Sequence, residues 1–170
     1  PKESWEMHLD IAKSTGINTI ATYVPWIIHE EIYRQYEFNN DFDLAHFITL
    51  CKKRNLDVIL KPGPFIMAEM KNEGLPYWLY EKFPEIIPNT WENRTVTTPM
   101  IDYLHPVFLN EVYVWYQKLI QILKPFIDSD ENPIVGIQLD NEVGMLSWVS
   151  NQPELTEDII SSLKAHLPSL

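Results

Sequence analysis

The segment 133–142, with the sequence PIVGIQLDNE, constrains the fold more than any other part of this chain. Apolar residues occupy every second position, which is typical of a β-strand with one apolar face; they are Val135, Ile137 and Leu139. The strand then ends in a polar cluster that includes Asn141 and Glu142. In parallel α/β folds the carboxyl ends of the strands face the ligand crevice. The segment therefore predicts an amide and a carboxyl at the functional edge of a parallel sheet.

Helix and strand patterns alternate along the whole chain. Strand patterns cover residues 17–24, 56–61 and 133–141. Helix patterns cover residues 5–14, a stretch from a cap at Asp41 or Asp43 to Asn55, a stretch from Pro106 to Pro125, and a last stretch capped by Thr156. This alternation predicts an α/β fold built from βα units around a parallel sheet, with no linker that divides the chain.

Three strands are too few to close a barrel, and both outer strands would have unpaired edges. Either the sheet is open or parts of the domain are missing at both ends, and we expect the second. Residues 70–104 form a long connection rich in Pro, Trp and Tyr, and a connection of this length is usually functional.

The composition excludes several classes of protein. The chain of 170 residues is 45% hydrophobic and 12% aromatic, which is typical of a globular domain. Its net charge is −11 and it has no basic run, so we expect no nucleic-acid partner and no attachment to an anionic membrane. Cys51 is the single cysteine, so no internal disulfide can form, and its position on an apolar helical stripe predicts a buried thiol.

Polar side chains follow all three predicted strands. Tyr23 is near the end of the first strand, Glu69 follows the second, and Asn141 and Glu142 follow the third. In a parallel barrel these strand ends converge on one face. An amide can bind a sugar hydroxyl and a carboxyl can donate and accept a proton, so the set suits glycoside chemistry. Taken alone, the Asn–Glu pair could equally be a helix cap or a turn.

Four stretches of the chain resemble the retaining β-galactosidases of glycoside hydrolase family 35. They are TYVPWIIHE at 22–30, KPGPFIMAE at 61–69, GLPYWL at 74–79 and QLDNEVG at 138–144. The last stretch is also similar to the related family 42 β-galactosidases. The resemblance implies a partial TIM (β/α)8 barrel, about strands two to four with their helices. Residues 1–170 would then be a fragment of a single catalytic barrel domain, with the remainder of its own barrel as its partner.

The resemblance also implies a role for individual residues. Glu142 would be the catalytic general acid/base, and Asn141 would bind the sugar 2-hydroxyl. Tyr23, Ala68 and Glu69 would line the galactose site. The nucleophile would be a glutamate on a later strand, beyond residue 170, so the isolated chain is expected to be inactive. No cofactor and no metal are implied.

Several positions depart from the family pattern and leave the sugar preference open. Met67 replaces a cysteine, Met70 a tryptophan, Ile27 an asparagine, Glu31 a proline and Val143 a tyrosine. The expected substrate is a galactoside or another oligosaccharide, cleaved at a terminal β-galactosyl unit. The alternatives are a β-glycosidase of different sugar specificity and a barrel that binds carbohydrate without cleaving it.

The remaining polar and aromatic residues near these strand ends have simpler interpretations. His29 and Glu30 lack the spacing of a zinc-binding helix, so we expect a hydrogen-bonded supporting role for them. Trp26 and Trp78 could stack on a sugar ring, although packing is the more common role of a tryptophan. Asp140 is expected to support the strand layers or a neighbouring basic residue.

Overall fold

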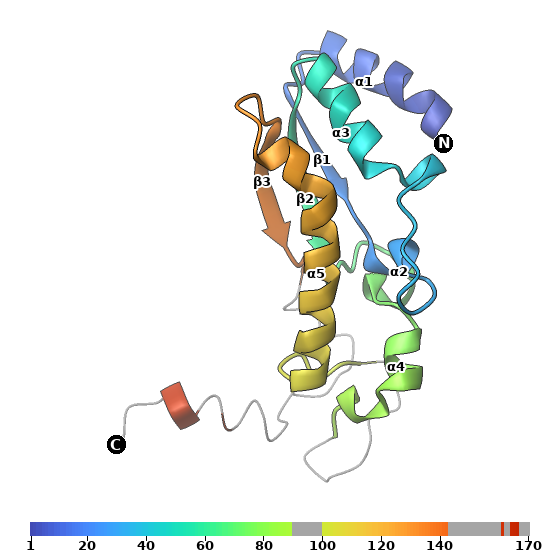
Figure 1. Cartoon of the computed structure of the whole chain (residues 1–170), viewed down its shortest axis with the longest axis vertical. Coiled ribbons are helices and arrows are strands. Elements are labelled where there is room, and N and C mark those ends of the chain that lie inside the picture. The colour runs from blue at the N-terminus through green and yellow to red at the C-terminus, as the bar shows by residue number, and fades with distance from the viewer. Residues whose placement is uncertain (90–99, 143–160, 162–163, 167–170) are drawn as a thin grey trace.

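The computed structural model describes residues 1–89, 100–142, 161 and 164–166. It contains a parallel sheet of three strands in the order β1–β2–β3 (Figure 1). The strands are β1 (Thr19–Tyr23), β2 (Asp57–Gly63) and β3 (Ile134–Leu139). The predicted parallel sheet is therefore confirmed, and each strand begins and ends within a few residues of its predicted bounds. The predicted helix after Thr156 lies largely outside the described residues.

Helices connect the strands in the predicted alternation. They are α1 (Trp5–Ser14), α2 (Trp26–His29), α3 (Leu44–Lys53), α4 (Trp78–Lys82) and α5 (Pro106–Ile127). Short 3₁₀ turns occur at η1 (Lys2–Ser4), η2 (Asn40–Phe42), η3 (Lys71–Gly74) and η4 (Pro84–Ile86). In the described part of the long connection, residues 70–89 and 100–104, the structure has one short helix and two of these turns. None of the helices in the described ranges is long and apolar enough to cross a bilayer.

The ends of the two longer βα helices test the sequence rules. Of the two predicted caps, Asp41 and Asp43, the structure has Asp43 at the start of α3, where its carboxylate accepts a hydrogen bond of 2.9 Å from the backbone N–H of His46. The predicted end of α5 at Pro125 is wrong, because the helix continues to Ile127. A proline this close to a helix end removes only one backbone hydrogen bond in the last turn, so the helix tolerates it.

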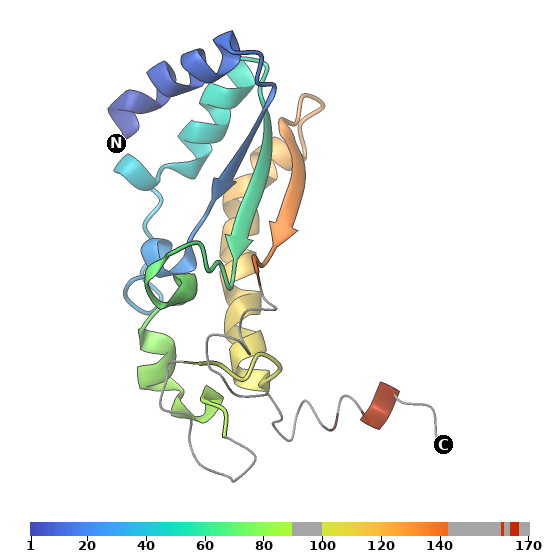
Figure 2. The same ribbon diagram turned by 180° about the vertical axis from the view of Figure 1, so that it is seen from behind.

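One face of the sheet is covered by α5, and Figure 2 shows the strands in front of this helix when the molecule is seen from behind. Val58 and Leu60 of β2 are fully buried against this layer. The same apolar cluster contains Ile48 and Cys51 of α3 and Trp115 of α5, all fully buried. Each fully buried side chain of this size contributes about 1.5–3 kcal/mol to folding. The prediction of a buried Cys51 thiol is confirmed.

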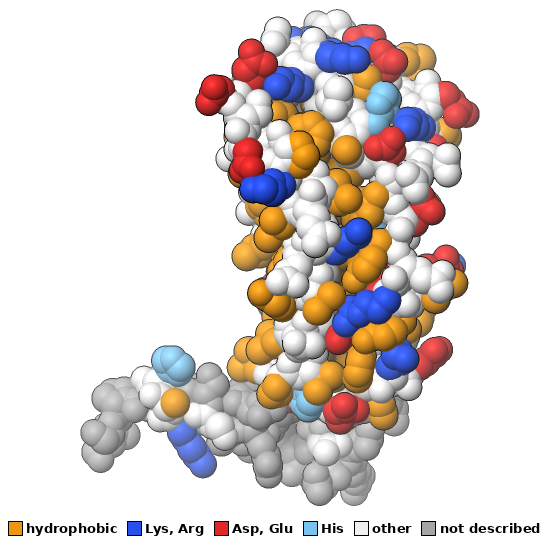
Figure 3. Space-filling model, in the orientation of Figure 1, with side chains coloured by type: hydrophobic (Ala, Val, Ile, Leu, Met, Phe, Trp, Pro, Cys, Tyr) orange, Lys and Arg blue, Asp and Glu red, His pale blue; other side chains and the backbone are white. Residues whose placement is uncertain are grey.

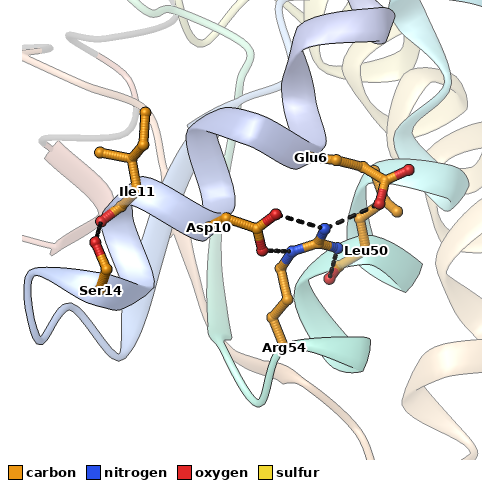
Figure 4. A network of polar contacts seen from close by, with 6 residues as sticks. All are labelled: Glu6, Asp10, Ile11, Ser14, Leu50 and Arg54. Atoms are coloured by element: carbon orange, nitrogen blue, oxygen red, sulfur yellow. Dashed lines mark hydrogen bonds and ion pairs between the residues drawn. The ribbon is translucent and has the colours of Figure 1, made fainter.

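Ion pairs join α1 to α3 at the surface. The Arg54 guanidinium lies 2.7 Å from a carboxylate oxygen of Asp10 and 2.9 Å from one of Glu6, and it also donates to the Leu50 carbonyl (Figure 4). The arginine holds the pKa of Asp10 below its usual range. Because both carboxylates are exposed, solvent screens the pairs, and their net effect on stability is small.

The apolar face that the sequence predicts for β3 is exposed. Val135, Ile137 and Leu139 are 59%, 49% and 64% exposed. The burial of β3 alternates along the strand, so these three side chains share the sheet face that no described element packs against. Hydrophobic side chains also line the solvent side of α5 (Figure 3); they are Leu109, Tyr113, Ile120 and Ile127. The sequence correctly predicts an apolar strand face, but the described residues do not bury it.

Candidate active site

The carboxyl ends of the three strands lie at the same edge of the sheet, as parallel pairing requires. Tyr23 ends β1 and is paired in register with Lys61 of β2. The Lys61 ammonium lies 5.1 Å from the centre of the Tyr23 ring, within the range of a cation–π contact. The half-buried Tyr23 side chain is therefore held beside the end of β2.

Hydrogen bonds join the end of β3 to the loop that follows β2. The backbone N–H of Asn141 donates to the Phe65 carbonyl at 2.9 Å, and the Asn141 amide donates to the Ile66 carbonyl at 2.9 Å. The backbone N–H of Asp140 donates to the Gly63 carbonyl at 2.9 Å. These bonds bring Asn141 to the loop that carries Ala68 and Glu69.

Helix α5 fixes the end of β2 from the other side. The Trp115 indole N–H donates to the Pro62 carbonyl at 3.2 Å, and the Tyr116 hydroxyl donates to the Gly63 carbonyl at 2.5 Å. Burial raises the pKa of Tyr116, so this hydroxyl keeps its proton at neutral pH. The carbonyl groups at the end of β2 are thus held by bonds from both α5 and β3.

The Asn141 side chain is oriented but not saturated. Its oxygen accepts a hydrogen bond of 3.0 Å from the Gln138 amide, while one of its N–H groups donates to Ile66. A primary amide has two N–H donors and an oxygen with two lone pairs. The bonds made within the described residues leave one N–H and one lone pair for a ligand hydroxyl.

The backbone around the candidate site is left-handed at several residues other than glycine. The φ angles of Met67, Ala68 and Glu69 are +57°, +46° and +52°. Those of Asp140 and Glu142 are +57° and +54°. Each such residue costs about 1–3 kcal/mol and persists only where surrounding contacts enforce it, and such residues cluster at active sites and ligand clamps.

A close approach of backbone helps to enforce the loop after β2. Gly74 has a φ of +88°, and a Cβ atom at this position would lie 3.0 Å from the Ile66 Cβ. The backbone N–H of Ile66 donates to the Glu73 carbonyl at 2.8 Å. Only glycine fits here without displacing Ile66, which closes the loop that contains Ala68 and Glu69.

The two candidate carboxylates are presented to solvent. Glu69 and Glu142 are exposed, whereas Ala68 and Asn141 are half-buried. Among the residues that the structure describes, neither carboxylate forms a salt bridge. Both groups therefore lie at adjacent strand ends in positions that a ligand can reach. No group of His, Cys, Asp and Glu in the described ranges is arranged to hold a metal ion.

Glu30 and His29 are buried polar groups at the end of α2, and both form hydrogen bonds. The Glu30 carboxylate accepts hydrogen bonds of 2.7 Å from the Trp26 indole and from the backbone N–H of Arg34. Its backbone carbonyl accepts another of 2.8 Å from the Trp78 indole. Burial raises the pKa of Glu30 and lowers the pKa of His29, whose Nδ1 lies 2.8 Å from the Glu37 carbonyl. These bonds fit the predicted supporting role of both residues.

Trp26 and Trp78 serve as packing residues. They are 0% and 5% exposed, and their rings meet edge to face at 5.7 Å. Both indole N–H groups donate to Glu30, that of Trp26 to the carboxylate and that of Trp78 to the backbone carbonyl. Stacking on a sugar ring would need an open ring face, which neither side chain has.

Two contacts of the site region were missed by the sequence reasoning. The Arg34 guanidinium lies 2.7 Å from the buried Glu111 carboxylate of α5. Glu111 shares an apolar helical stripe with Val112 and Trp115, and a charged residue on such a stripe could have indicated a buried partner. Asp140 was expected to support the strand layers or a basic residue; the Phe65 N–H after β2 donates to its carboxylate, and the Tyr103 hydroxyl is a further donor that the sequence did not indicate.

Comparison with known proteins connects this geometry to a family. A model of the glycosyl hydrolases family 35 matches residues 1–167. A β-1,2-glucosyltransferase of Ignavibacterium album is 37% identical over 165 residues, which cover 94% of this chain and 23% of that protein. An exo-β-D-glucosaminidase of Pyrococcus horikoshii is 36% identical, covering 92% of this chain and 21% of that protein. The β-galactosidase of Mus musculus is 38% identical, covering 85% of this chain and 20% of that protein.

The solved structures show the same fold. A β-galactosidase from Rahnella sp. R3 superposes with a TM-score of 0.69 at 13% sequence identity, covering 97% of this chain and 22% of that one. The chain therefore has the fold of part of a glycosidase barrel, and it spans about a fifth of the length of the relatives it matches. Because the family model covers nearly every residue and the strand ends carry the expected side chains, this chain belongs to glycosyl hydrolase family 35.

Proposed function

We propose that this chain forms the acid/base side of the active site of a retaining β-glycosidase that removes terminal β-galactosyl units. The observation that carries the proposal is the end of β3, where an exposed Glu142 follows an Asn141 that is fixed against the β2 loop. Family membership and the mouse β-galactosidase relative support carbohydrate hydrolysis as the reaction.

Glu142 acts as the general acid/base. Retaining hydrolysis needs two carboxyl groups about 5–5.5 Å apart, one to protonate the leaving oxygen and one to attack the anomeric carbon. Glu142 protonates the glycosidic oxygen as the sugar transfers to the nucleophile, and then removes a proton from the water that releases the sugar. Its exposed position at a strand end gives the glycosidic oxygen access to the carboxyl.

The other predicted residues bind the sugar. The remaining N–H of Asn141 donates to the 2-hydroxyl, a contact that strengthens in the oxocarbenium-like transition state. Glu69 accepts hydrogen bonds from sugar hydroxyls, and Ala68 and Tyr23 line the site beside it. The left-handed loop at Met67–Glu69 presents this side of the site, and the closed contact of Gly74 with Ile66 supports it.

The nucleophile comes from a part of the barrel outside these residues. The relatives are about four to five times longer than the stretch they share with this chain, which leaves room for further strands. In the described sheet β3 is an outer strand, so a further strand would add at its edge, and the exposed apolar side chains of β3 and α5 are surfaces that the added elements would cover. This chain therefore contributes one of the two carboxyls and depends on the remainder of its own barrel for activity.

A β-glycosidase of different sugar specificity is the second candidate. Relatives described as an exo-β-D-glucosaminidase and a β-1,2-glucosyltransferase match this chain at 36% and 37% identity, close to the 38% of the mouse β-galactosidase. Met67 lies in the left-handed loop where the family pattern has a cysteine, so the sugar-binding edge differs from that pattern. A glucosamine or glucose unit in place of galactose would leave the role of Glu142 unchanged.

The test uses the full-length protein that contains this chain. Hydrolysis of p-nitrophenyl β-D-galactoside, β-D-glucoside and β-D-glucosaminide is compared, and the anomeric configuration of the first product is recorded by NMR. We expect the galactoside to be cleaved fastest, with retention. Faster cleavage of the glucosaminide would favour the second candidate. Binding of galactose without cleavage of any glycoside would establish a binding barrel and exclude catalysis.

A further inference from the structure

Asp140 lies in the turn between β3 and Glu142 and has no role in the proposed chemistry. One oxygen of its carboxylate accepts a hydrogen bond of 2.5 Å from the Tyr103 hydroxyl and another of 3.2 Å from the backbone N–H of Phe65. The carboxylate therefore connects three segments: the turn after β3, the loop after β2, and the stretch that leads into α5.

The segment that carries Tyr103 is itself well fixed. Ile101 is 1% exposed and Asp102 is 4% exposed. The backbone N–H of Asp102 donates to the Ile86 carbonyl at 2.7 Å, and the backbone N–H of Leu104 donates to the Asp102 carboxylate. The Tyr103 ring lies edge to face on the Phe108 ring of α5, with 5.3 Å between the ring centres. The Tyr103 hydroxyl therefore occupies a fixed point relative to the sheet.

The turn that it contacts is conformationally costly. Asp140 and Glu142 both have left-handed φ angles, and a glutamate adopts this conformation far less readily than an asparagine or a glycine. Such a turn persists only where the surrounding contacts enforce it. The bonds at Asp140 are contacts of this kind, because they join the residue two positions before Glu142 to the loop after β2 and to the segment before α5.

We propose that Tyr103 is a positioning residue: through its hydrogen bond to Asp140, it holds the left-handed turn that aims Glu142 at the scissile bond. The inference rests on the proposed acid/base role of Glu142 and assigns the residues that orient it. In this role Tyr103 acts on the reaction only through the direction of the Glu142 carboxyl, by way of its bond to Asp140.

This role makes a specific kinetic prediction. General acid assistance matters most when the leaving group is a poor one, because a weakly acidic aglycone needs a proton to depart. A misplacement of about 1 Å can slow an enzymatic step by about 10²-fold. A misdirected Glu142 should therefore slow poor leaving groups selectively, whereas general damage to the site would slow all of them.

The experiment removes one hydroxyl in the full-length protein with Tyr103→Phe. We expect kcat/KM for the methyl β-glycoside of the preferred sugar to fall about 10- to 100-fold. For the dinitrophenyl glycoside of the same sugar we expect less than about a threefold change, and the thermal midpoint should stay close to that of the unaltered protein. The matched control is Tyr113→Phe, since Tyr113 is an exposed residue of α5 whose hydroxyl contacts only the Gln117 amide among the described residues. It should change neither rate.

A double variant tests the connection between the two residues. If Tyr103 acts through Asp140, the double change Tyr103→Phe/Asp140→Ala should be no slower than Asp140→Ala alone. Losses that multiply, or equal losses for both leaving groups, would overturn the positioning role while leaving the function of Glu142 intact. If Glu142→Gln hydrolyses both substrates as fast as the unaltered protein, the acid/base assignment fails, and the positioning role fails with it.

Discussion

Glu30 and Glu142 are two glutamates near the same edge of the sheet, and their surroundings are opposite. Glu30 is 0% exposed, its carboxylate accepts bonds from the Trp26 indole and the Arg34 backbone, and the Arg34 guanidinium connects it to Glu111 on α5. Glu142 is exposed and left-handed, and in the described chain no salt bridge engages it. The two groups can therefore serve different purposes.

The difference shows how the fold separates support from chemistry. A buried carboxylate is tolerated only when its hydrogen bonds are satisfied. Glu30 therefore stabilises the fold and cannot exchange its hydrogen-bond partners during a reaction. A carboxyl that must donate and accept protons has to remain accessible to substrate. The left-handed backbone at Asp140 and Glu142 raises the free energy of the turn that presents this carboxyl. The hydrogen bonds at Asp140 offset part of that strain.

The largest expected effect comes from Glu142→Gln in the full-length protein. We expect kcat/KM for a glycoside with a poor leaving group to fall about 10²- to 10⁴-fold, because acid assistance is lost. Stability should hardly change, since the side chain is exposed. Steady-state kinetics and thermal unfolding measure the two quantities, with Glu31→Gln, an exposed glutamate in the loop after α2, as the control. An unaltered rate would remove Glu142 from the mechanism.

Glu30→Ala should show the reverse pattern. Truncation leaves the Trp26 indole and the Arg34 backbone without their acceptor, and breaking a buried charged contact of this kind costs about 3 kcal/mol of unfolding free energy. Urea unfolding of the variant measures this loss. The adjacent and exposed Glu31→Ala should lose less than about 0.5 kcal/mol. Equal losses in the two variants would contradict the supporting role of Glu30.

A buried ionisable group also predicts how stability depends on pH. Burial raises the pKa of the Cys51 thiol from 9.0 to about 11. A pKa raised by folding means that stability is fully present below pH 9 and falls as the pH rises toward 11, by up to about 1.4 kcal/mol per pH unit. Urea titrations between pH 8 and 11 should show this slope in the unaltered chain. Cys51→Ala removes the group, so a slope of the same size in that variant would assign it elsewhere.

The smallest effect is expected at the strained loop after β2. Ala68 has a φ of +46°, so Ala68→Gly should raise the unfolding free energy by about 1 kcal/mol through relief of strain, reduced by the greater freedom of glycine in the unfolded chain. Glycine at the half-buried Ala12 of α1 has no such strain to relieve and should destabilise by about 1 kcal/mol. Thermal unfolding of both variants measures the two changes. A loss of stability in Ala68→Gly would show that the loop is not strained.

Local patterns in the sequence determined the elements and their order. The alternation of apolar periods predicted the three parallel strands, and Asp43 was a recognisable cap, because both depend on neighbours a few residues away. The four motifs and the strand ends placed Tyr23, Asn141 and Glu142 at one edge of the sheet. The same rules failed at Pro125, where the missing N–H removes a single backbone bond and only two helical residues follow.

Contacts between distant segments were decided only by the tertiary structure. Tyr103 and Asp140 are 37 positions apart, and the local sequence around either residue does not predict a contact with the other. The salt bridge between Arg34 and Glu111 and the exposed apolar face of β3 have the same origin, since each depends on which elements lie beside one another. Periodicity determines which face of an element is apolar, whereas burial and hydrogen-bond partners depend on the packing of whole elements.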